Sequence, residues 1–326
     1  MKVFLRTFGC RANHADSEAV RAMLVTAGHE VVDDPRGAEA AVFNSCAVTA
    51  DAEADLRQAV RGAARAAPGI RSVVMGCVAG LDDRAPMLHA LPGVRDIVPG
   101  ADLAHLASVL GIDAVQARAV LPQSTTRAHL RIQDGCDEHC TFCATTLARG
   151  ANRSRGADDI VRDAQALADA HAEIVLTGIH IGTWGRDIGS SLGALVERLV
   201  CDVPGVRFRL SSIEATEVDE RLGDLLSAHD GRVAPHLHAP LQSGSDRVLR
   251  RMGRHWYSAA AYAGAVERLA SRCVVRGLGA DVIVGFPGET AEDHAATVAL
   301  CEHLPFTYLH VFPYSPRPGT AATRLG

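Results

Sequence analysis

The sequence is poor in lysine and has no long apolar run, and both absences narrow the classes of protein to consider. Lys2 is the only lysine among 33 basic residues, and the formal net charge of the 326-residue chain is −5. This balance excludes a uniformly basic nucleic-acid-binding surface, so an RNA partner would have to be met by local arginine patches. No stretch of about 18 apolar residues occurs, and no membrane span is predicted. The first residues lead directly into a patterned α/β segment rather than a signal peptide, so we expect a cytoplasmic protein.

A fourth cysteine is missing from the most crowded cysteine motif. Cys136, Cys140 and Cys143 have the spacing CxxxCxxC, and the next cysteine is Cys201. A structural zinc site is closed by four ligands, so three neighbouring thiolates do not complete one. A 4Fe–4S cluster held by three cysteines instead keeps one iron open for a substrate or cofactor. The nine cysteines of the chain are too unevenly placed for a secreted disulfide scaffold, and they indicate metal binding or chemistry.

Residues 1–121 repeat one pattern three times. Apolar, strand-like runs end at Cys10, Cys46 and Cys77, and each is followed by a helix-like stretch, the last of which reaches Leu91. Successive cysteines are 36 and 31 residues apart, about one strand–helix unit each. Ligand sites of an open parallel sheet collect at the carboxyl ends of its strands. We therefore predict an N-terminal parallel-sheet α/β domain over residues 1–121, with the three cysteines along one edge.

A second domain is predicted over residues 128–326, after a linker at Val120 to Ala128 in which turn-forming residues replace periodicity. Six strand-like runs alternate with helical stretches: HLRIQDGC, EIVLTGIH, VRFRLSSIE, PHLHAPLQSGS, GADVIVGFPGE and YLHVFPYSPRPG. Each run leaves through a polar or glycine-containing loop, where a (β/α) barrel places its chemistry. The predicted fold class is α/β, with a partial (β/α)6 barrel that carries the CxxxCxxC motif after its first strand.

This motif, at the first strand of a partial barrel, resembles the signature of the radical S-adenosylmethionine (SAM) enzymes. In that family SAM binds the open iron, and an electron from the cluster cleaves SAM to yield a 5′-deoxyadenosyl radical. The whole chain resembles one subfamily, the methylthiotransferases. Their second cluster is held by three N-terminal cysteines, which match Cys10, Cys46 and Cys77 in TFGCRAN, NSCAVT and MGCVAG. Six segments are most similar to the enzymes that act on N6-threonylcarbamoyladenosine of tRNA: CRANHADSEAV, LTGIHIGTWGRD, RLSSIEATEVDE, HLHAPLQSGSDRVLRRM, ADVIVGFPGETAEDH and HVFPYSPRPGTAA.

The resemblance implies an activity, its cofactors and its partners. A methylthio group would be added to carbon 2 of N6-threonylcarbamoyladenosine at position 37 of tRNA. The cofactors would be SAM and two 4Fe–4S clusters, one on each set of three cysteines. The auxiliary, N-terminal cluster also keeps an open iron, which can hold the sulfur to be transferred. The tRNA anticodon stem-loop, an electron donor and a sulfur source would be partners, and no membrane would be involved.

The resemblance also places SAM contacts on the loops after successive strands. SAM needs hydrogen-bonding groups for its methionine and ribose, and glycines where the backbone approaches closely. The expected contacts are Thr177, Gly178, Ser211, Ser212, Glu214, Gln242, Ser243, Gly244, Gly285, Phe286, Pro287 and Gly288.

RNA contacts are expected in two arginine-rich segments. One segment follows the CxxxCxxC motif, and the other precedes His255, Trp256 and Tyr257. Arginine with neighbouring aromatic residues suits phosphate contact and base stacking in a single-stranded loop, although a solvated helix face would give the same pattern. The arginines are Arg149, Arg153, Arg155, Arg247, Arg250, Arg251 and Arg254.

Three features depart from the family pattern. After Cys143 the family often has two aliphatic residues and a proline, whereas this chain has Ala144, Thr145 and Thr146. Without the proline, the sequence does not show how stiff this loop is. Gly80 stands where a glutamine is usual, close to the third N-terminal cysteine. Family members commonly continue into a small RNA-binding β-barrel domain, which is absent here, so we expect either a shortened chain or a naturally short enzyme.

Two alternative functions remain open at this point. The first is a related methylthiotransferase that acts on isopentenyladenosine in tRNA or on an aspartate of a small-subunit ribosomal protein. The second is a non-catalytic iron–sulfur protein that senses redox state or binds RNA, and it predicts clusters without reductive SAM cleavage. The three other cysteines, Cys201, Cys273 and Cys301, are expected to be small buried hydrophobic residues.

Overall fold

The chain folds into two compact units in the computed structural model, which describes residues 1–47, 50–113, 119–228, 231–272 and 275–326. Unit 1 comprises Met1–Gln123 and Ala144–Gly150. Unit 2 comprises Ser124–Cys143 and Ala151–Gly326. A short segment from the second half of the sequence therefore packs with the first half. Within the described ranges, no helix has both the length and the apolar character that a membrane crossing requires.

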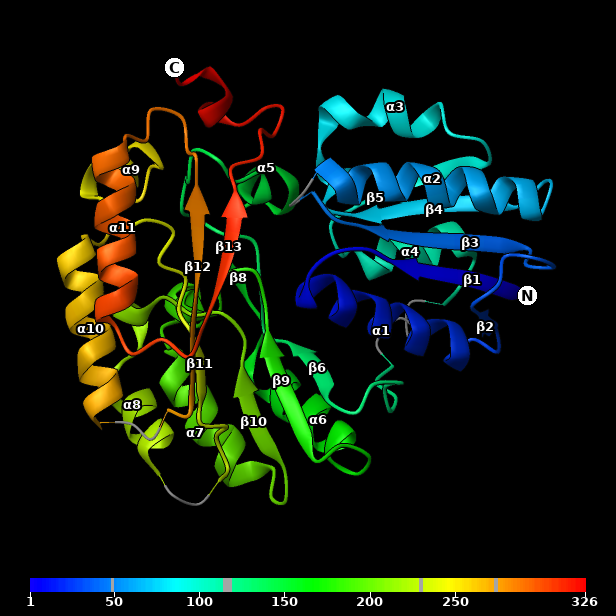
Figure 1. The fold of residues 1–326 in the computed structure, drawn as a ribbon. Coiled ribbons are helices and arrows are strands. Elements are labelled where there is room, and N and C mark those ends of the chain that lie inside the picture. Colours follow the sequence, from blue (N-terminus) through cyan, green and yellow to red (C-terminus); the bar gives the residue numbers. More distant parts are fainter. Residues whose placement is uncertain (48–49, 114–118, 229–230, 273–274) are drawn as a thin grey trace. The chain divides into compact units, whose positions relative to one another are not determined.

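Unit 1 is built on a five-stranded sheet with helices on both faces (Figure 1). Its strands lie in the order β2-β1-β3-β4-β5, and all pairings are parallel. The strands are β1 Lys2–Thr7, β2 Glu30–Val32, β3 Ala40–Ser45, β4 Arg71–Gly76 and β5 Val94–Pro99. The helices are α1 Arg11–Thr26, α2 Ala50–Ala66, the 3₁₀ turns η1 Val78–Gly80 and η2 Asp82–Arg84, α3 Ala85–His89 and α4 Leu103–Leu110.

Neighbouring residues of a strand point to opposite faces of this sheet and enter two separate cores. Val3 packs with Met23 of α1 on one face, whereas Phe4 packs with Leu56 of α2 on the other. Burial on both faces explains why the strands read as continuous apolar runs, and it confirms the predicted parallel-sheet fold. The helix expected between Cys77 and Leu91 is wrong in its length, because two 3₁₀ turns precede the five-residue α3.

Unit 2 contains six parallel strands in chain order. Two three-stranded sheets, β6-β9-β10 and β11-β12-β13, meet at a parallel bridge between Ser212 and His238. The strands are β6 Ala128–Arg131, β9 Glu173–Thr177, β10 Arg207–Leu210, β11 His236–His238, β12 Gly277–Val284 and β13 Tyr308–Pro313. The pair β7 Gln133–Asp134 and β8 Arg153–Ser154 is a separate antiparallel ribbon. These six strands confirm the predicted partial barrel.

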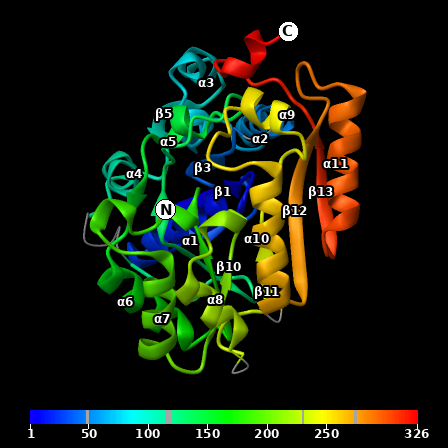
Figure 2. The same ribbon diagram turned by 90° about the vertical axis from the view of Figure 1, so that its left-hand side faces the viewer.

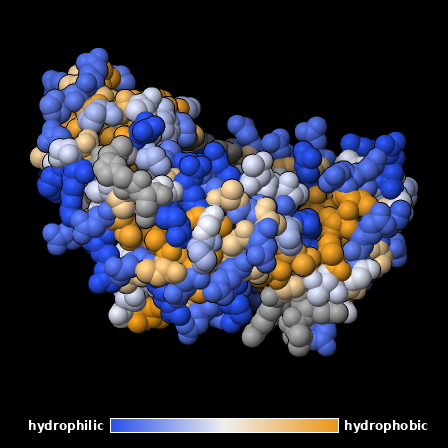
Figure 3. All heavy atoms as spheres, turned by 90° about the horizontal axis from the view of Figure 1, so that it is seen from below, coloured by the Kyte–Doolittle hydropathy of each residue, from blue (hydrophilic) through white to orange (hydrophobic). Residues whose placement is uncertain are grey.

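Helices cover the outer side of this curved sheet; α10 and α11 lie together on one side of β12 in Figure 1, and Figure 2 shows the same helices from that side. The helices of unit 2 are α6 Ala157–Ala168, α7 Leu192–Asp202, α8 Glu220–Ser227, α9 Asp246–Arg251, α10 Ala259–Arg272 and α11 Ala291–His303. The short helical turns are η4 Ile181–Thr183, η5 Arg186–Ile188, η6 Ala215–Glu217 and η7 Ala321–Arg324. The face in Figure 3 carries apolar side chains in separate patches between polar ones.

The helix α5, Thr145–Arg149, belongs to unit 1 although the strand before it belongs to unit 2. Ala144 and Ala148 join Cys77 and Leu81 in a small buried cluster. An ideal Cβ on Gly80 would lie only 2.1 Å from the carbonyl oxygen of Ala148. The glycine at this position is therefore explained by the close approach of the α5 backbone to η1.

Candidate functional site

Cys10, Cys46 and Cys77, the N-terminal trio, follow the carboxyl ends of three adjacent strands, β1, β3 and β4. The register pairs Thr7 with Asn44 and Ser45 with Gly76, so these strands end side by side. Cys10 is exposed, whereas Cys46 and Cys77 are buried. The prediction that one edge of the sheet brings these three thiols together agrees with this placement.

The backbone below the N-terminal trio is closely packed and polar. Gly9 has φ +105°, and an ideal Cβ there would lie 2.3 Å from the Cβ of Cys46. The fully buried Asn13 donates from Nδ2 to Asn44 Oδ1 and to the carbonyl oxygen of Ser45, both at 3.0 Å. Asn13 Oδ1 also lies 3.3 Å from Cys10 Sγ. The segment CRAN thus anchors one cysteine to the strand that carries the next one.

Cys77 is contacted by a buried cation. Arg149, the last residue of α5, donates from Nε to Cys77 Sγ at 3.2 Å and from a terminal nitrogen to Asp16 at 2.8 Å. The side chains of Arg149 and Asp16 are both 0% exposed. Burial raises the pKa of the Cys77 thiol, and the charge and hydrogen bond of Arg149 act in the opposite direction. The guanidinium of Arg149, which was expected to contact RNA, is buried against Cys77 and Asp16 in this structure.

Cys136, Cys140 and Cys143, the barrel-loop trio, lie in the loop after β7 and are half-buried. Backbone bonds hold this loop, since Thr141 donates to the carbonyl of Met252 at 2.8 Å and accepts from Ala322 at 2.7 Å. Phe142 packs edge-on against Phe286, with ring centroids 6.3 Å apart. These contacts fix the loop before residue 144, so its stiffness does not depend on the proline that the sequence lacks.

Two cations contact the barrel-loop trio. Arg254 places a terminal nitrogen 3.5 Å from Cys140 Sγ and pairs with the buried Glu214. Burial raises the pKa of the Cys140 thiol to about 12, and the charge of Arg254 opposes this. His180 lies with Nδ1 3.6 Å from Cys136 Sγ and Nε2 2.8 Å from Glu217.

The surroundings of His180 also change the pKa of its imidazole. Burial lowers the pKa of the imidazole, but hydrogen bonds to Cys136 and Glu217 outweigh burial and raise it to about 10. His180 and Arg254 therefore face two different cysteines of the barrel-loop trio, Cys136 and Cys140.

The residues expected to contact SAM lie at the carboxyl ends of β9 to β12: Thr177 is the last residue of β9, and the others lie on the loops that follow these strands. Thr177 Oγ1 and Glu214 Oε2 are buried and have no hydrogen-bond partner among the described residues. Gln242 has φ 65°, and it is the one non-glycine residue with positive φ in the described part of the chain. Unsatisfied buried oxygens of this kind need a ligand or water, so the loops after β9 and β10 have the chemistry of a polar cofactor site.

The other expected SAM contacts differ in exposure. Ser211 and Ser243 are buried, Ser212 is exposed, and Phe286 is 2% exposed and packs in a small core with Phe142. Gly178, Gly244, Gly285, Pro287 and Gly288 lie in the same loops.

The expected RNA-contacting arginines fall into two groups. Arg254 is buried against Glu214 and the rings of Trp256 and Tyr257, and Arg149 is buried as well. The remaining five reach the surface to different degrees and have protein partners. Arg153 binds Asp134, Arg155 binds Asp163, Arg247 binds Asp293, Arg250 binds the carbonyl of Asp246 and Arg251 binds the carbonyl of Pro287.

Comparisons with known proteins agree with this geometry. Residues 130–301 match the radical SAM superfamily, and residues 2–100 match uncharacterized protein family UPF0004. Threonylcarbamoyladenosine tRNA methylthiotransferase MtaB of Bacillus subtilis is 37% identical over 99% of this chain and 75% of its own length. The Thermotoga maritima protein of the same name is 36% identical over 99% of this chain and 77% of its own. This chain belongs to the radical SAM methylthiotransferase family. A tRNA-2-methylthio-N(6)-dimethylallyladenosine synthase of Frankia casuarinae is 36% identical over 98% of this chain and 63% of its own length.

Membership of the family implies SAM and a 4Fe–4S cluster in this methylthiotransferase, and the residues present fit both. The barrel-loop trio offers three thiols with cationic neighbours. Thr177 and Glu214 offer unsatisfied oxygens at the ends of β9 and β10, which follow β6 in the order of the sheet. The N-terminal trio offers a similar donor set in unit 1. Sequence reasoning missed Asp16, Gln133 and His180, because an isolated acidic, amide or imidazole side chain gives no local signal of its role.

Gln133 organises the start of the methylthiotransferase barrel site. Its fully buried amide accepts from the backbone N–H groups of Ile179 and His180 at 2.9 and 2.8 Å. It also donates to the carbonyl of Gly135, just before Cys136, at 2.6 Å. One side chain thus holds the loop after β9 against the cysteine loop.

A second polar cluster lies on β11, β12 and β13. Asp281 Oδ1 is 2.9 Å from His238 Nε2 and 3.2 Å from His310 Nδ1. The Tyr308 hydroxyl joins His238 Nδ1 and His236 Nε2 at 3.1 and 2.9 Å. The spacing would admit one metal ion, but hydrogen bonds account for each of these contacts, and we assign no ion to it.

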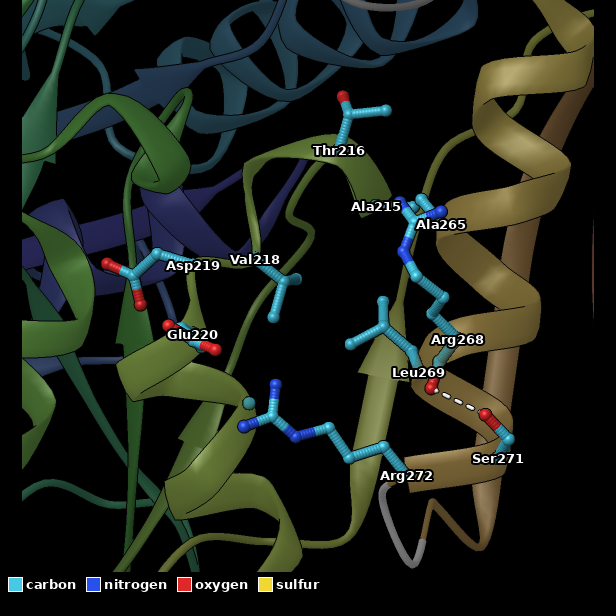
Figure 4. Close-up of a pocket in the computed structure, with 11 residues that line it drawn as sticks. Ala215, Thr216, Val218, Asp219, Glu220, Ala265, Arg268, Leu269, Ser271 and Arg272 are labelled. Atoms are coloured by element: carbon cyan, nitrogen blue, oxygen red, sulfur yellow. Dashed lines mark hydrogen bonds between the residues drawn. The ribbon is translucent and has the colours of Figure 1, made fainter.

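A cavity of about 430 Å³ lies between η6, α8 and α10 of unit 2 (Figure 4). Asp219 and Glu220 line one side, and Arg268 and Arg272 line the other. Arg272 is paired with Asp224 at 2.5 Å. None of the predicted site residues lines this cavity. The remaining cysteines are also outside the site: Cys201 is exposed rather than buried, Cys301 is half-buried, and Cys273 lies outside the described residues.

Proposed function

We propose that this protein adds a methylthio group to carbon 2 of N6-threonylcarbamoyladenosine at position 37 of tRNA, using SAM and two 4Fe–4S clusters. The observation that carries the proposal is that each unit presents three cysteines: the N-terminal trio follows three adjacent parallel strands, and the barrel-loop trio lies in the one loop after β6 and β7. Three thiolates leave one iron of a cubane open, so each unit can bind one further ligand at its cluster. The names of the full-length relatives support tRNA as the substrate and the threonylcarbamoyl form as its modification.

The chain's residues would bind and orient the reactants. When bound, the clusters and SAM supply the radical and sulfur chemistry that protein side chains lack. Cys136, Cys140 and Cys143 would hold the cluster that binds SAM, with His180 and Arg254 stabilising its thiolates. Thr177 and Glu214 would satisfy their buried oxygens with polar groups of SAM. Cys10, Cys46 and Cys77 would hold the auxiliary cluster that carries the sulfur.

The arginines at the surface remain candidates for tRNA phosphate contacts. Arg153, Arg247 and Arg250 are exposed, so their guanidinium groups can reach a ligand without unfolding the site. We expect Arg250→Ala to weaken tRNA binding and to reduce the salt slope of log K by about 1, as for one lost phosphate contact. Arg162→Ala, at an exposed arginine of α6 paired with Asp159, is the matched control and is expected to leave both unchanged. If Arg250→Ala and Arg162→Ala change the tRNA affinity and the salt slope equally, Arg250 is not a phosphate contact.

The substrate is tested with two tRNAs that differ at one nucleoside. The reconstituted protein is incubated anaerobically with SAM, a reductant and tRNA that carries either N6-threonylcarbamoyladenosine or N6-dimethylallyladenosine at position 37. Nucleoside mass spectrometry is expected to find the methylthio product from the first tRNA, with 5′-deoxyadenosine formed alongside. Product from the second tRNA alone would overturn the choice of substrate but leave the reaction class intact.

A second candidate substrate is supported by a specific observation. The dimethylallyladenosine synthase of Frankia casuarinae is 36% identical to this chain, nearly the value of the Bacillus subtilis relative. The chain spans 75% of the length of the latter and 63% of the length of the former. Formation of clusters without any 5′-deoxyadenosine would instead support a non-catalytic iron–sulfur protein.

A further inference from the structure

A buried arginine, Arg149, contacts Cys77, one of the three cysteines of the N-terminal trio. Arg149 and Asp16 form an ion pair with both side chains fully buried. Replacing such a pair by apolar residues is often neutral or stabilising, so the pair is not explained by stability. The third member of the contact is a thiol that the proposed function assigns to a cluster, and Arg149 Nε donates to it at 3.2 Å.

The local fold is arranged to bring this arginine to the thiol. The α5 backbone packs against η1, which starts directly after Cys77, and the contact tolerates only glycine at position 80 without displacement. Arg149 ends the helix, and Gly150 follows it with φ 71°, which lets the chain leave at once. The seven residues Ala144–Gly150 therefore serve unit 1 by covering Cys77 and delivering one guanidinium.

We propose that Arg149 is a positioning residue for the N-terminal cluster, and that its hydrogen bond to Cys77 raises the reduction potential of that cluster. The proposal rests on the proposed function, which places a cluster on the N-terminal trio. A reduced cluster carries one more negative charge than an oxidised one, and N–H donors to its sulfur ligands stabilise that charge. The effect is strong where water is excluded, as it is at Arg149.

Asp16 sets the strength of this effect. It accepts a second hydrogen bond from the guanidinium at 2.8 Å and places a negative charge next to it. Loss of the Asp16 charge removes a negative charge next to Arg149 and Cys77, which favours the reduced cluster further. Removal of the arginine favours the oxidised cluster. The two changes therefore shift the potential in opposite directions, whereas a purely structural role predicts damage of the same kind from both.

Arg254 at Cys140 is an independent instance of the same chemistry in unit 2. It is buried, contacts one thiol of the barrel-loop trio and pairs with Glu214, 40 residues away in the sequence. Two unrelated segments thus place a carboxylate-anchored arginine on one cysteine of each trio. This repetition is expected if the arginines act on clusters, and it is not required by either fold.

The test isolates the N-terminal cluster by replacing the barrel-loop trio with alanine. The reduction potential of the remaining cluster is measured by an anaerobic redox titration followed by electron paramagnetic resonance, with iron counted in each sample. The variants are Arg149→Lys, Asp16→Asn and the double change Arg149→Met with Asp16→Leu, which avoids a buried unpaired charge. Arg36→Met is the control, because Arg36 pairs with Asp34 ahead of β3, at the amino edge of the sheet.

We expect the double variant to keep its iron and to show at least a tenfold lower ratio of reduced to oxidised cluster at a fixed potential. That ratio corresponds to a downward shift of about 59 mV for a one-electron couple. Asp16→Asn is expected to shift the potential upward, Arg149→Lys to give a smaller downward shift, and the control to give none. An unchanged potential in the double variant, or loss of iron in both the double variant and Arg149→Lys, would overturn the proposal. Failure of the parent protein to bind any cluster on the N-terminal trio would instead overturn the proposed function.

Discussion

Replacement of Gly80 by alanine is expected to loosen α5 from unit 1. The new Cβ would lie 2.1 Å from the carbonyl oxygen and 3.0 Å from the carbonyl carbon of Ala148. Ordinary contacts begin near 3.4 Å, so the α5 backbone has to retreat by about 1.3 Å from the oxygen contact alone. Because both contacted atoms belong to the backbone, no side-chain rotation relieves the overlap.

The size of the effect follows from the cost of overpacking, which is typically about 1–3 kcal/mol. Since about 1.4 kcal/mol is a factor of ten, local opening of α5 becomes roughly 5- to 150-fold more frequent. Amide hydrogen exchange measures this opening directly. The N–H groups of Ala148 and Gly150 donate to the carbonyls of Ala144 and Thr146, and we expect their exchange to accelerate by that factor.

Gly62→Ala supplies the matched control. Gly62 lies inside α2, and an ideal Cβ there meets no atom within 4 Å. The same substitution is expected to stabilise α2 by up to about 1 kcal/mol, because alanine is the better helix former. Unchanged protection of α5 in Gly80→Ala, measured beside this control, would refute the close packing of α5 on η1 and the positioning of Arg149 with it.

Three further predictions concern the two trios, SAM and the stability of unit 2. Alanine at any cysteine of the barrel-loop trio abolishes reductive SAM cleavage, whereas alanine in the N-terminal trio leaves cleavage but stops sulfur insertion; equal loss of both activities would contradict this division. Thr177→Val removes an unsatisfied buried oxygen, and equilibrium dialysis is expected to show SAM binding about tenfold weaker, for the loss of a hydrogen bond of roughly 1–1.5 kcal/mol. Urea unfolding is expected to show that the SAM-free protein is not destabilised. Hydrogen bonds from Arg247, Ser245 and Thr290 hold the pKa of Asp293 below its usual range. The stability that ionised Asp293 contributes is therefore present above its unfolded pKa of about 3.9 and is lost as the pH falls through its folded pKa. We expect Asp293→Asn to lower the free energy of unfolding at pH near 7 but not in strong acid. An equal loss of stability at both pH values would contradict this role of Asp293.

Strand periodicity was sufficient to predict the positions of the cysteines. Each thiol follows an apolar run, and parallel strands place such positions along one edge, as the structure has them for Cys10, Cys46 and Cys77. The strand β2 gave no signal, because it has only three residues, one exposed and two half-buried, at the border of the sheet. The transfer of α5 to unit 1 could not be predicted either, since nothing in seven residues records which unit they pack against.

The roles of the arginines were the least predictable part of the site. An arginine is charged in every context, so its sequence neighbours do not tell a phosphate partner from a carboxylate partner. The carboxylates that bind Arg149 and Arg254 are 133 and 40 residues away along the chain. Gly80 illustrates the same limit, because its departure from the family pattern becomes understandable only when the carbonyl of Ala148 is seen beside it.

The most direct test of the account is a count of iron and sulfide per chain after anaerobic reconstitution. Two cubanes predict about eight irons in the unaltered protein and about four in each of two variants, one lacking the N-terminal trio and the other the barrel-loop trio. About four irons in the unaltered protein, with no loss on replacement of the N-terminal trio, would contradict the claim that both units hold a cluster.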